Sequence, residues 1–129
     1  VVSGCSVTID YAAGVVHIGL PITAEVETLE VTVFGGDPIR DRAKCIPQVT
    51  IDVEETIGLL VGPDANNLES IPVRTDEYYT DPTALQTGTG TAYPATTWNK
   101  SGRILIRQSD PLPATVLAIL PNVQIGGVG

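Results

Sequence analysis

The single histidine of the chain, His17, is the only residue around which a Ser-His-Asp or Cys-His nucleophile arrangement can be built. It lies in residues 15–18, whose β-branched side chains predict a strand. The chain has no G-x-S-x-G motif to expose a nucleophilic serine on a sharp turn. The fifteen carboxylates give no specific support for the acid and base pair of a glycosidase. We therefore interpret His17 as a mid-strand histidine with an ordinary hydrogen bond, and we predict no catalytic residue and no enzymatic activity.

One segment carries oxygen-bearing side chains at a spacing that loosely matches a calcium loop: Asp64, Asn66, Asn67 and Glu69. It lacks the glycine at the sixth position and the late bidentate glutamate of such a loop. We therefore predict a turn stabilised by Asx hydrogen bonds. The segment Gly88-Thr89-Gly90 is followed by neither a lysine nor a helix start, so it is not a phosphate loop. The sequence predicts no metal site and no cofactor.

The two cysteines, Cys5 and Cys45, lie far apart and form no C-x-x-C motif. Neither a redox motif nor a zinc site is therefore indicated. A disulfide between them stays an open alternative, because sequence alone does not show whether their Cα atoms come within bridging range. We predict two buried free thiols, since free cysteine behaves as a small apolar residue.

The length of 129 residues fits one β domain spanning residues 1–129. The chain begins with Val1, and no basic region followed by an apolar stretch marks a signal peptide. We expect a fragment of a longer polypeptide. The longest apolar run, residues 113–121, is far shorter than the ~20 residues that cross a bilayer. We therefore expect a soluble piece that does not insert into a membrane.

The formal net charge of −8 argues against binding to a phosphate backbone, which recruits clustered Lys and Arg. The one basic cluster consists of Arg40, Arg42 and Lys44, interleaved with Asp41. We interpret it as a solvated loop or strand start, with an inter-subunit ion-pair patch as the alternative. Residues 1–39 contain five acids and no Lys or Arg, which predicts a face of one sign: Asp10, Glu25, Glu27, Glu30 and Asp37.

The elements that would position these residues are strands, and the most strongly patterned stretch is residues 103–120. Two apolar runs flank a segment with two prolines and an aspartate, which predicts a pair of strands around a turn. Ile104 and Ile106 should face one side, with Arg103, Leu105 and Arg107 on the other. The second run, residues 116–120, has no polar member, which suggests a strand covered on both faces or buried at a subunit contact.

Further strands are predicted by alternation of apolar and polar residues at residues 7–10, 15–18, 25–33 and 48–54, the last of these without a fault. Short apolar runs at residues 57–61 and 71–74 add two more. The high content of Gly, Pro, Val, Ile and Thr agrees with a β-rich chain. The apolar content exceeds the need of a small monomer, so we expect burial against neighbouring chains.

Residues 75–98 have no sustained periodicity and are rich in Thr, Gly, Pro, Asp and Tyr. We predict a long ordered loop, and loops of this length in a compact domain usually contact a partner. Its aromatic residues are of the kind that interfaces favour, and we take them as a candidate interface: Tyr78, Tyr79, Tyr93 and Trp98. The predicted fold is all-β, an antiparallel β-sandwich or barrel-like domain with one long ordered loop.

Three stretches, in the right order, resemble the C-terminal region of the tail nozzle protein of short-tailed bacteriophages, also called tail tubular protein B. Residues 16–29 are similar to a glycine-leucine-proline-tyrosine stretch that leads to a threonine-leucine pair, here Gly19-Leu20-Pro21 with Ile22 in place of the tyrosine. Residues 44–62 resemble a strand that ends in glycine-leucine and valine-glycine pairs. The third stretch begins at Arg103 and ends at the glycine pair 126–127, passing through Asp110-Pro111-Leu112-Pro113.

The resemblance implies a virion structural protein of the phage tail, assembled in the host cytoplasm. It implies self-assembly into a ring, usually a hexamer, that contacts other phage tail proteins and lines the DNA exit channel. DNA then passes by without specific binding, and an acidic wall would help the duplex to slide because it repels phosphate. A ring subunit also buries apolar surface against its neighbours. The resemblance adds no catalytic residue.

Two prolines flank Leu112 and leave the turn few conformations to lose on folding. Residues 110–113 are therefore either a rigid joint that presents Leu112 to a partner or a tight connection without one. The alternative function is a β-sandwich recognition module that binds carbohydrate or a host receptor through residues 75–98. A hydrolase fragment that uses His17 or a carboxylate pair is a third class.

Overall fold

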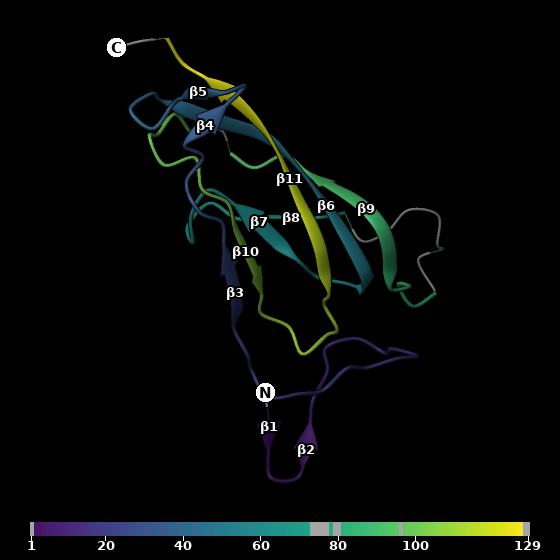
Figure 1. The fold of residues 1–129 in the computed structure, drawn as a ribbon. Coiled ribbons are helices and arrows are strands. Elements are labelled where there is room, and N and C mark those ends of the chain that lie inside the picture. The colour runs from purple at the N-terminus through teal and green to yellow at the C-terminus, as the bar shows by residue number, and fades with distance from the viewer. Residues whose placement is uncertain (1, 73–77, 79–80, 96, 128–129) are drawn as a thin grey trace.

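The structure, a computed structural model, describes residues 2–72, 78, 81–95 and 97–127, which hold eleven β-strands and no helix. One antiparallel sheet has the order β3 (Ala24–Glu27), β10 (Leu105–Gln108), β7 (Leu60–Gly62) and β8 (Glu69–Ser70). The other has the order β11 (Val116–Ile125), β6 (Lys44–Thr56) and β9 (Gln86–Ala92). Two small hairpins pair β1 (Val2–Ser3) with β2 (Ser6–Val7) and β4 (Val33–Phe34) with β5 (Asp37–Pro38) (Figure 1).

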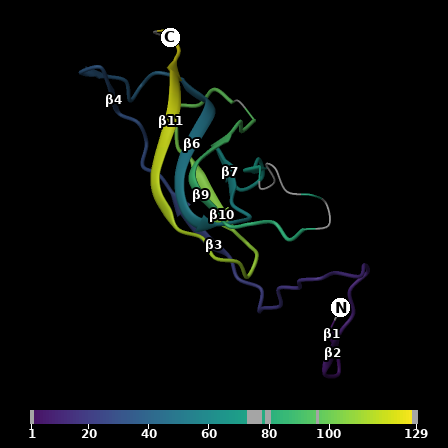
Figure 2. The same ribbon diagram turned by 90° about the vertical axis from the view of Figure 1, so that its right-hand side faces the viewer.

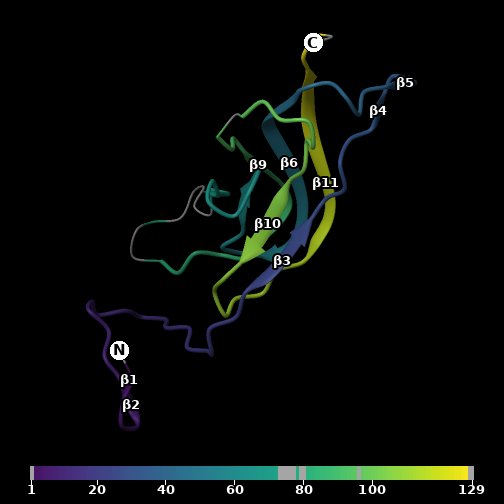
Figure 3. The same ribbon diagram turned by 90° about the vertical axis from the view of Figure 1, so that its left-hand side faces the viewer.

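The two larger sheets lie in two layers around one hydrophobic core. Figure 3 shows β3 and β10 in front of β6 and β11. Val49, Ile51 and Val53 of β6 alternate along the strand and are fully or almost fully buried. Asp52 and Glu54 lie on the outer face of the strand. Side chains from both sheets complete the core: Ile46, Leu59, Val61, Ile71, Ala92, Ile104 and Ile106. The predicted all-β sandwich is confirmed, and the barrel-like alternative is wrong because the sheets do not close on each other.

The strands predicted within residues 103–120 exist, but they do not pair with each other. β10 pairs with β3 and β7, whereas β11 pairs with β6 in the opposite sheet. Residues 109–115 therefore cross from one layer to the other. The predicted strand pair is thus wrong in its pairing and correct in its strands.

β11 is an edge strand, and within the single chain it is not covered on both faces as predicted. Leu117 and Leu120 are 59% and 53% exposed, respectively. Ile119 and Val123 pack against the core but are only partly buried. The outer side of β11 has no neighbouring strand among the described residues, which explains this exposure. Burial of β11 at a subunit contact stays a prediction.

The N-terminal segment departs most from the prediction. The strands expected at residues 7–10 and 15–18 do not form, and only Ser6–Val7 is a strand in that region. Residues 4–27 are all exposed, and residues 4–23 lead away from the sandwich beyond residues 109–115 (Figures 1 and 2). These sequences have strand propensity, but no strand of the described residues lies beside them to complete a ladder. We refer to residues 4–23 as the arm.

The predicted long loop at residues 75–98 contains a strand, so that prediction is wrong in part. β9 pairs with β6, and its glycines Gly88 and Gly90 lie opposite Val53 and Ile51. A β-carbon at Gly90 would lie 2.9 Å from the Cγ2 atom of Ile71, so the position needs glycine for space. The predicted strand at residues 71–74 is absent at residues 71–72, and the remainder lies outside the described residues. Of the strand predicted at residues 25–33, only residues 24–27 and the start of β4 form.

Candidate functional site

The two motifs that carry the resemblance, residues 19–21 and 110–113, meet in the structure. Gly19 lies on the ring of Pro111, and a β-carbon at position 19 would overlap the Cβ atom of that proline. Leu20 is exposed next to this contact. The chain leaves the sandwich at this point, so Gly19 and Pro111 fix where the arm departs. Both motifs could be identified from the sequence, but nothing in the sequence indicates that they touch.

The turn at residues 110–113 is held by Gln108, a residue that our sequence analysis did not identify. Gln108 is 5% exposed, and its Nε2 donates to the carbonyl oxygens of Ile57 at 2.9 Å and Leu112 at 3.1 Å. The backbone N–H of Leu112 donates to the carbonyl of Asp110 at 2.7 Å. Gln108 follows Ile104 and Ile106 in the inward-facing alternation of β10, and this spacing predicts its burial. The turn is therefore rigid because it is hydrogen-bonded as well as proline-rich.

An open depression of about 600 Å³ lies between this turn and the arm. Val15 and His17 line it from the arm, and Leu112 and Pro113 line it from the turn. Leu112 is half-buried, and its presentation to a partner stays a prediction. His17 is exposed and lies in the arm instead of in a strand, which corrects the prediction. It is the one titratable side chain in the lining, so the described part of the site holds no general acid and base pair.

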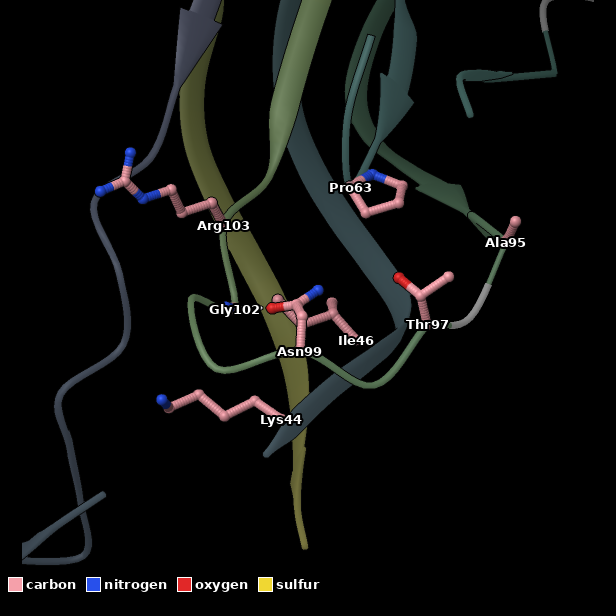
Figure 4. A pocket seen from close by; sticks show the side chains of 8 residues that line it. All are labelled: Lys44, Ile46, Pro63, Ala95, Thr97, Asn99, Gly102 and Arg103. Carbon is pink, nitrogen blue, oxygen red and sulfur yellow. Dashed lines mark hydrogen bonds between the residues drawn. The ribbon is translucent and has the colours of Figure 1, made fainter. Parts of the chain in front are cut away.

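Lys44 is fully buried, which corrects the prediction of a solvated basic cluster for this residue. Its Nζ donates to three backbone carbonyls, those of Arg40 at 3.5 Å, Arg42 at 3.3 Å and Lys100 at 2.5 Å. Figure 4 shows its side chain near Asn99 and Gly102, beside a cavity of about 10 Å³. That volume is close to the space for a single water. The ammonium group thus cross-links two chain segments, residues 40–44 and the segment at Lys100, and is buried within the chain.

Asn99 supports the Lys44 site through its backbone and side chain. The two backbones exchange hydrogen bonds, Lys44 N to Asn99 O at 2.6 Å and Asn99 N to Lys44 O at 3.0 Å. Asn99 Oδ1 accepts from the backbone N–H of Gly102 at 2.7 Å. Gly102 has φ +58°, and a β-carbon there would approach the Lys44 Cδ atom to 2.9 Å. Glycine is required at this position by both conformation and space.

The acids of residues 1–39 do not form the predicted face of one sign. Glu25 accepts from Arg107 Nε at 2.6 Å, and Glu27 accepts from Arg103 at 2.9 Å. Both arginines come from β10 or the residues before it, which lie beside β3 in the sheet. Similarly, Glu30 pairs with the exposed Arg40 at 2.8 Å. Three of the five acids are therefore neutralised by cations that are distant in sequence, while Asp10 and Asp37 are exposed.

The outer face of the β11–β6–β9 sheet is polar along β6. Asp52 is half-buried and lies between Thr89 of β9 and Ala118 of β11, and Glu54 is exposed. Thr50 and Thr91 lie side by side on neighbouring strands, with their hydroxyls 3.5 Å apart. One face of β6 packs while the other carries carboxylates, as the alternation of apolar and polar residues at residues 48–54 predicts. The sheet thus presents threonines and two acids on a regular surface.

The aromatic residues taken as a candidate interface are exposed where the structure describes them. Tyr78, Tyr93 and Trp98 are each more than half exposed, and Tyr79 lies outside the described residues. Trp98 approaches the C-terminal end of the chain, where its Cζ3 atom lies 3.4 Å from the position of a β-carbon at Gly126. Gly126 in turn donates from its N–H to the carbonyl of Ala43 at 2.8 Å. One edge of the indole is thus supported and the remainder faces outward.

The segment with loosely calcium-like spacing is an Asx turn, as predicted. Asp64 Oδ1 accepts from the backbone N–H of Asn66 at 2.8 Å and from Asn67 Nδ2 at 3.0 Å. The side-chain hydrogen bond from Asn67, followed by the backbone N–H of Asn66, lowers the pKa of Asp64 below its ordinary value of 3.8. In the described residues, no three His, Cys, Asp or Glu side chains gather in a group that could hold a metal ion.

Both cysteines are free thiols, so the alternative of a disulfide between them is wrong for this structure. Cys45 is buried, as predicted. Cys5 is exposed, which corrects its predicted burial, because it lies in the arm. Within the described ranges, the chain contains no helix long and apolar enough to cross a membrane.

Neither a scan of the chain against protein-family models nor a search of curated proteins found a match.

Proposed function

We propose that the chain is a non-enzymatic structural domain of a short bacteriophage tail, in which it forms part of the nozzle ring around the DNA exit channel. The observation that carries this proposal is the resemblance of three stretches in the order of that family's C-terminal region. The contact between Gly19 and Pro111 supports it, because two of these stretches meet at one point of the fold. Motifs that are far apart in sequence and touch in space belong to one structural feature.

The exposed apolar surface also supports self-assembly. Large apolar side chains are exposed along the arm and β11: Val7, Ile9, Tyr11, Val15, Val16, Ile18, Leu20, Ile22, Val116, Leu117 and Leu120. Single exposed apolar residues are ordinary on a monomer, whereas so many of them along two segments favour an interaction site. A ring subunit would bury such a surface against its neighbours. The ring size and its position in the virion are parts of the proposal.

The test is to image parent particles and to locate this domain in them. We expect density for the sandwich in a ring at the distal end of the short tail, with copies around the channel. A label fused after Gly127 should mark the same ring. Particles that contain no copy of the chain, or a full-length polypeptide that stays monomeric by mass measurement, would overturn the proposal.

The second candidate is a recognition module for carbohydrate or a host receptor, favoured by the exposure of Tyr93 and Trp98. Exposed tyrosine and tryptophan supply large contact area at low entropic cost. Glycan binding that is lost on Trp98→Ala and retained on Tyr11→Ala, a matched exposed aromatic in the arm, would favour it. No binding by the parent chain, or equal binding by both variants, would count against it.

A further inference from the structure

The outer edge of β11 is an unprotected strand edge. Within the described residues, β11 has a neighbour on one side alone, β6, and residues 116–125 contain no charged side chain. Native proteins usually protect such edges with charges, prolines or a covering segment, because the free backbone groups of an edge can pair with another chain. Pro121 is the one such device here, and it leaves residues 116–120 as an apolar edge.

A depression of about 280 Å³ lies beside this edge. It is lined by apolar residues of both sheets: Val26, Ile106, Val116, Leu117, Ala118 and Ile119. A strand that is added to an edge gains affinity from backbone hydrogen bonds and specificity from pockets that receive alternate side chains. The edge of β11 offers free backbone groups, and the depression offers a pocket for a side chain. Neither is lined by a charged residue.

The arm has the complementary properties. Residues 15–18 are uncharged apart from the titratable His17, have strand propensity and form no strand pair in the structure. Val15 and His17 face the depression beside Leu112, while Val16 and Ile18 alternate with them and are exposed. Four to five residues in a strand span roughly 13–17 Å, so residues 15–18 and 116–120 are similar in length.

The arm does not cover its own β11. Gly19 packs on Pro111, and Val15 and His17 line the depression with Leu112 and Pro113. Residues 15–18 thus lie beside the turn, and the outer edge of β11 in the same chain has no strand paired to it among the described residues. That edge is therefore open to a segment from another molecule.

We propose that residues 15–18 of one copy add as a strand to residues 116–120 of a second copy, with Val16 or Ile18 entering the depression beside β11. Each copy then offers one arm and one edge, so the contact is heterologous and repeats from copy to copy. Such contacts generate a ring when the rotation closes and a filament when it does not. The inference rests on the self-assembly in the proposed function and identifies the two surfaces that meet.

The experiment measures the mass of the chain over a wide concentration range by analytical ultracentrifugation. Leu120→Lys places a charge on the edge, at an exposed position outside the core. Val16→Pro removes a backbone N–H from the arm, which lies outside the sandwich and so leaves its folding intact. Leu29→Lys is the control, because Leu29 is exposed and belongs to neither surface. We expect each test variant to weaken self-association about tenfold or more, a change of about 1.4 kcal/mol, and the control to match the parent.

A mixture of the two test variants provides the decisive result. The Val16→Pro chain keeps an intact edge, and the Leu120→Lys chain keeps an intact arm. We therefore expect the mixture to form dimers at concentrations where each variant alone is monomeric. A monomeric parent chain, test variants that associate like the parent, or a mixture that forms no dimers would each overturn the inference.

This outcome is separable from that of particle imaging. A domain located in the tail ring with unaffected test variants would leave the proposed function standing and remove the inference. If the expected dimers form but no copy is found in the tail, the inference would stand and the proposed function would be removed.

Discussion

Lys44 Nζ donates a 2.5 Å hydrogen bond to the backbone carbonyl of Lys100, a residue 56 positions away in the chain. This bond joins the start of β6 to the segment that leads into β10, and thereby connects the two sheets at one end of the sandwich. The same ammonium also reaches the carbonyls of Arg40 and Arg42. A fully buried cation with carbonyl partners is therefore a structural cross-link in this fold.

Replacement of this cation should destabilise the domain. Lys44→Met keeps most of the aliphatic stem but leaves buried carbonyls without their donor, which should lower the free energy of unfolding by about 1–3 kcal/mol. Lys100→Met is the matched control, because the Lys100 side chain is exposed, and we expect a change within about 0.5 kcal/mol. Urea unfolding measures both. Equal stability of Lys44→Met and the parent chain would contradict the cross-link.

Local alternation was sufficient to predict the all-β class and the central strand of the fold. The faultless pattern of residues 48–54 placed Val49, Ile51 and Val53 in the core and Asp52 on the outer face, as observed. Burial follows from the two-residue period of a strand and requires no knowledge of its neighbours. β9 was missed because its alternating threonine and glycine carry no apolar signal.

Pairing between strands depends on chain crossings that the sequence does not show. Residues 103–120 have the pattern of a hairpin, yet β10 and β11 belong to different sheets. The same applies to the charges, because Glu25 and Arg107 are 82 positions apart and meet through the β3–β10 register. The contact of Gly19 with Pro111 is equally non-local. Residue types thus indicated the elements, and tertiary structure decided which of them meet.

The arm should be released by a side chain at position 19. Gly19→Ala places a β-carbon into the Pro111 ring, and we expect the arm to move away because its residues are exposed. Limited proteolysis within residues 8–23 should become faster, while the free energy of unfolding changes by less than about 0.5 kcal/mol. Gly14→Ala is the control, because no atom lies within 4 Å of a β-carbon there. Equal cleavage of the two variants would show that Gly19 does not anchor the arm.

The Asx turn predicts a pH dependence with a defined sign. The pKa of Asp64 is lowered in the folded chain, chiefly by the Asn67 side chain. The turn is therefore fully stabilised above the ordinary pKa of 3.8, and this stabilisation is lost as the pH falls through the lower folded value. In an NMR titration, Asn67→Ala should raise the pKa of Asp64 toward 3.8 but not fully, because Asn66 N–H still donates. An unchanged pKa would contradict the role of Asn67.

The outer face of β6 tests the channel in the proposed function. If Asp52 and Glu54 face passing DNA, the double variant Asp52→Lys, Glu54→Lys should slow DNA delivery from particles, because cations bind the phosphate backbone and hold the duplex. Both side chains lie outside the core, so we expect the unfolding temperature to stay near that of the parent. The delay should shrink at high salt, since added ions weaken phosphate binding.

Glu69→Lys is the control, a single charge reversal on the exposed edge strand β8 of the other sheet. We expect normal delivery from particles that carry it, because a channel wall formed by the outer face of β6 would not include β8. Delivery is measured as the fraction of the genome that leaves the particle over time, in parent and variant particles side by side. Normal delivery with the Asp52 and Glu54 variant would place β6 away from the channel, whereas an equal delay with Glu69→Lys would show an effect of net charge alone.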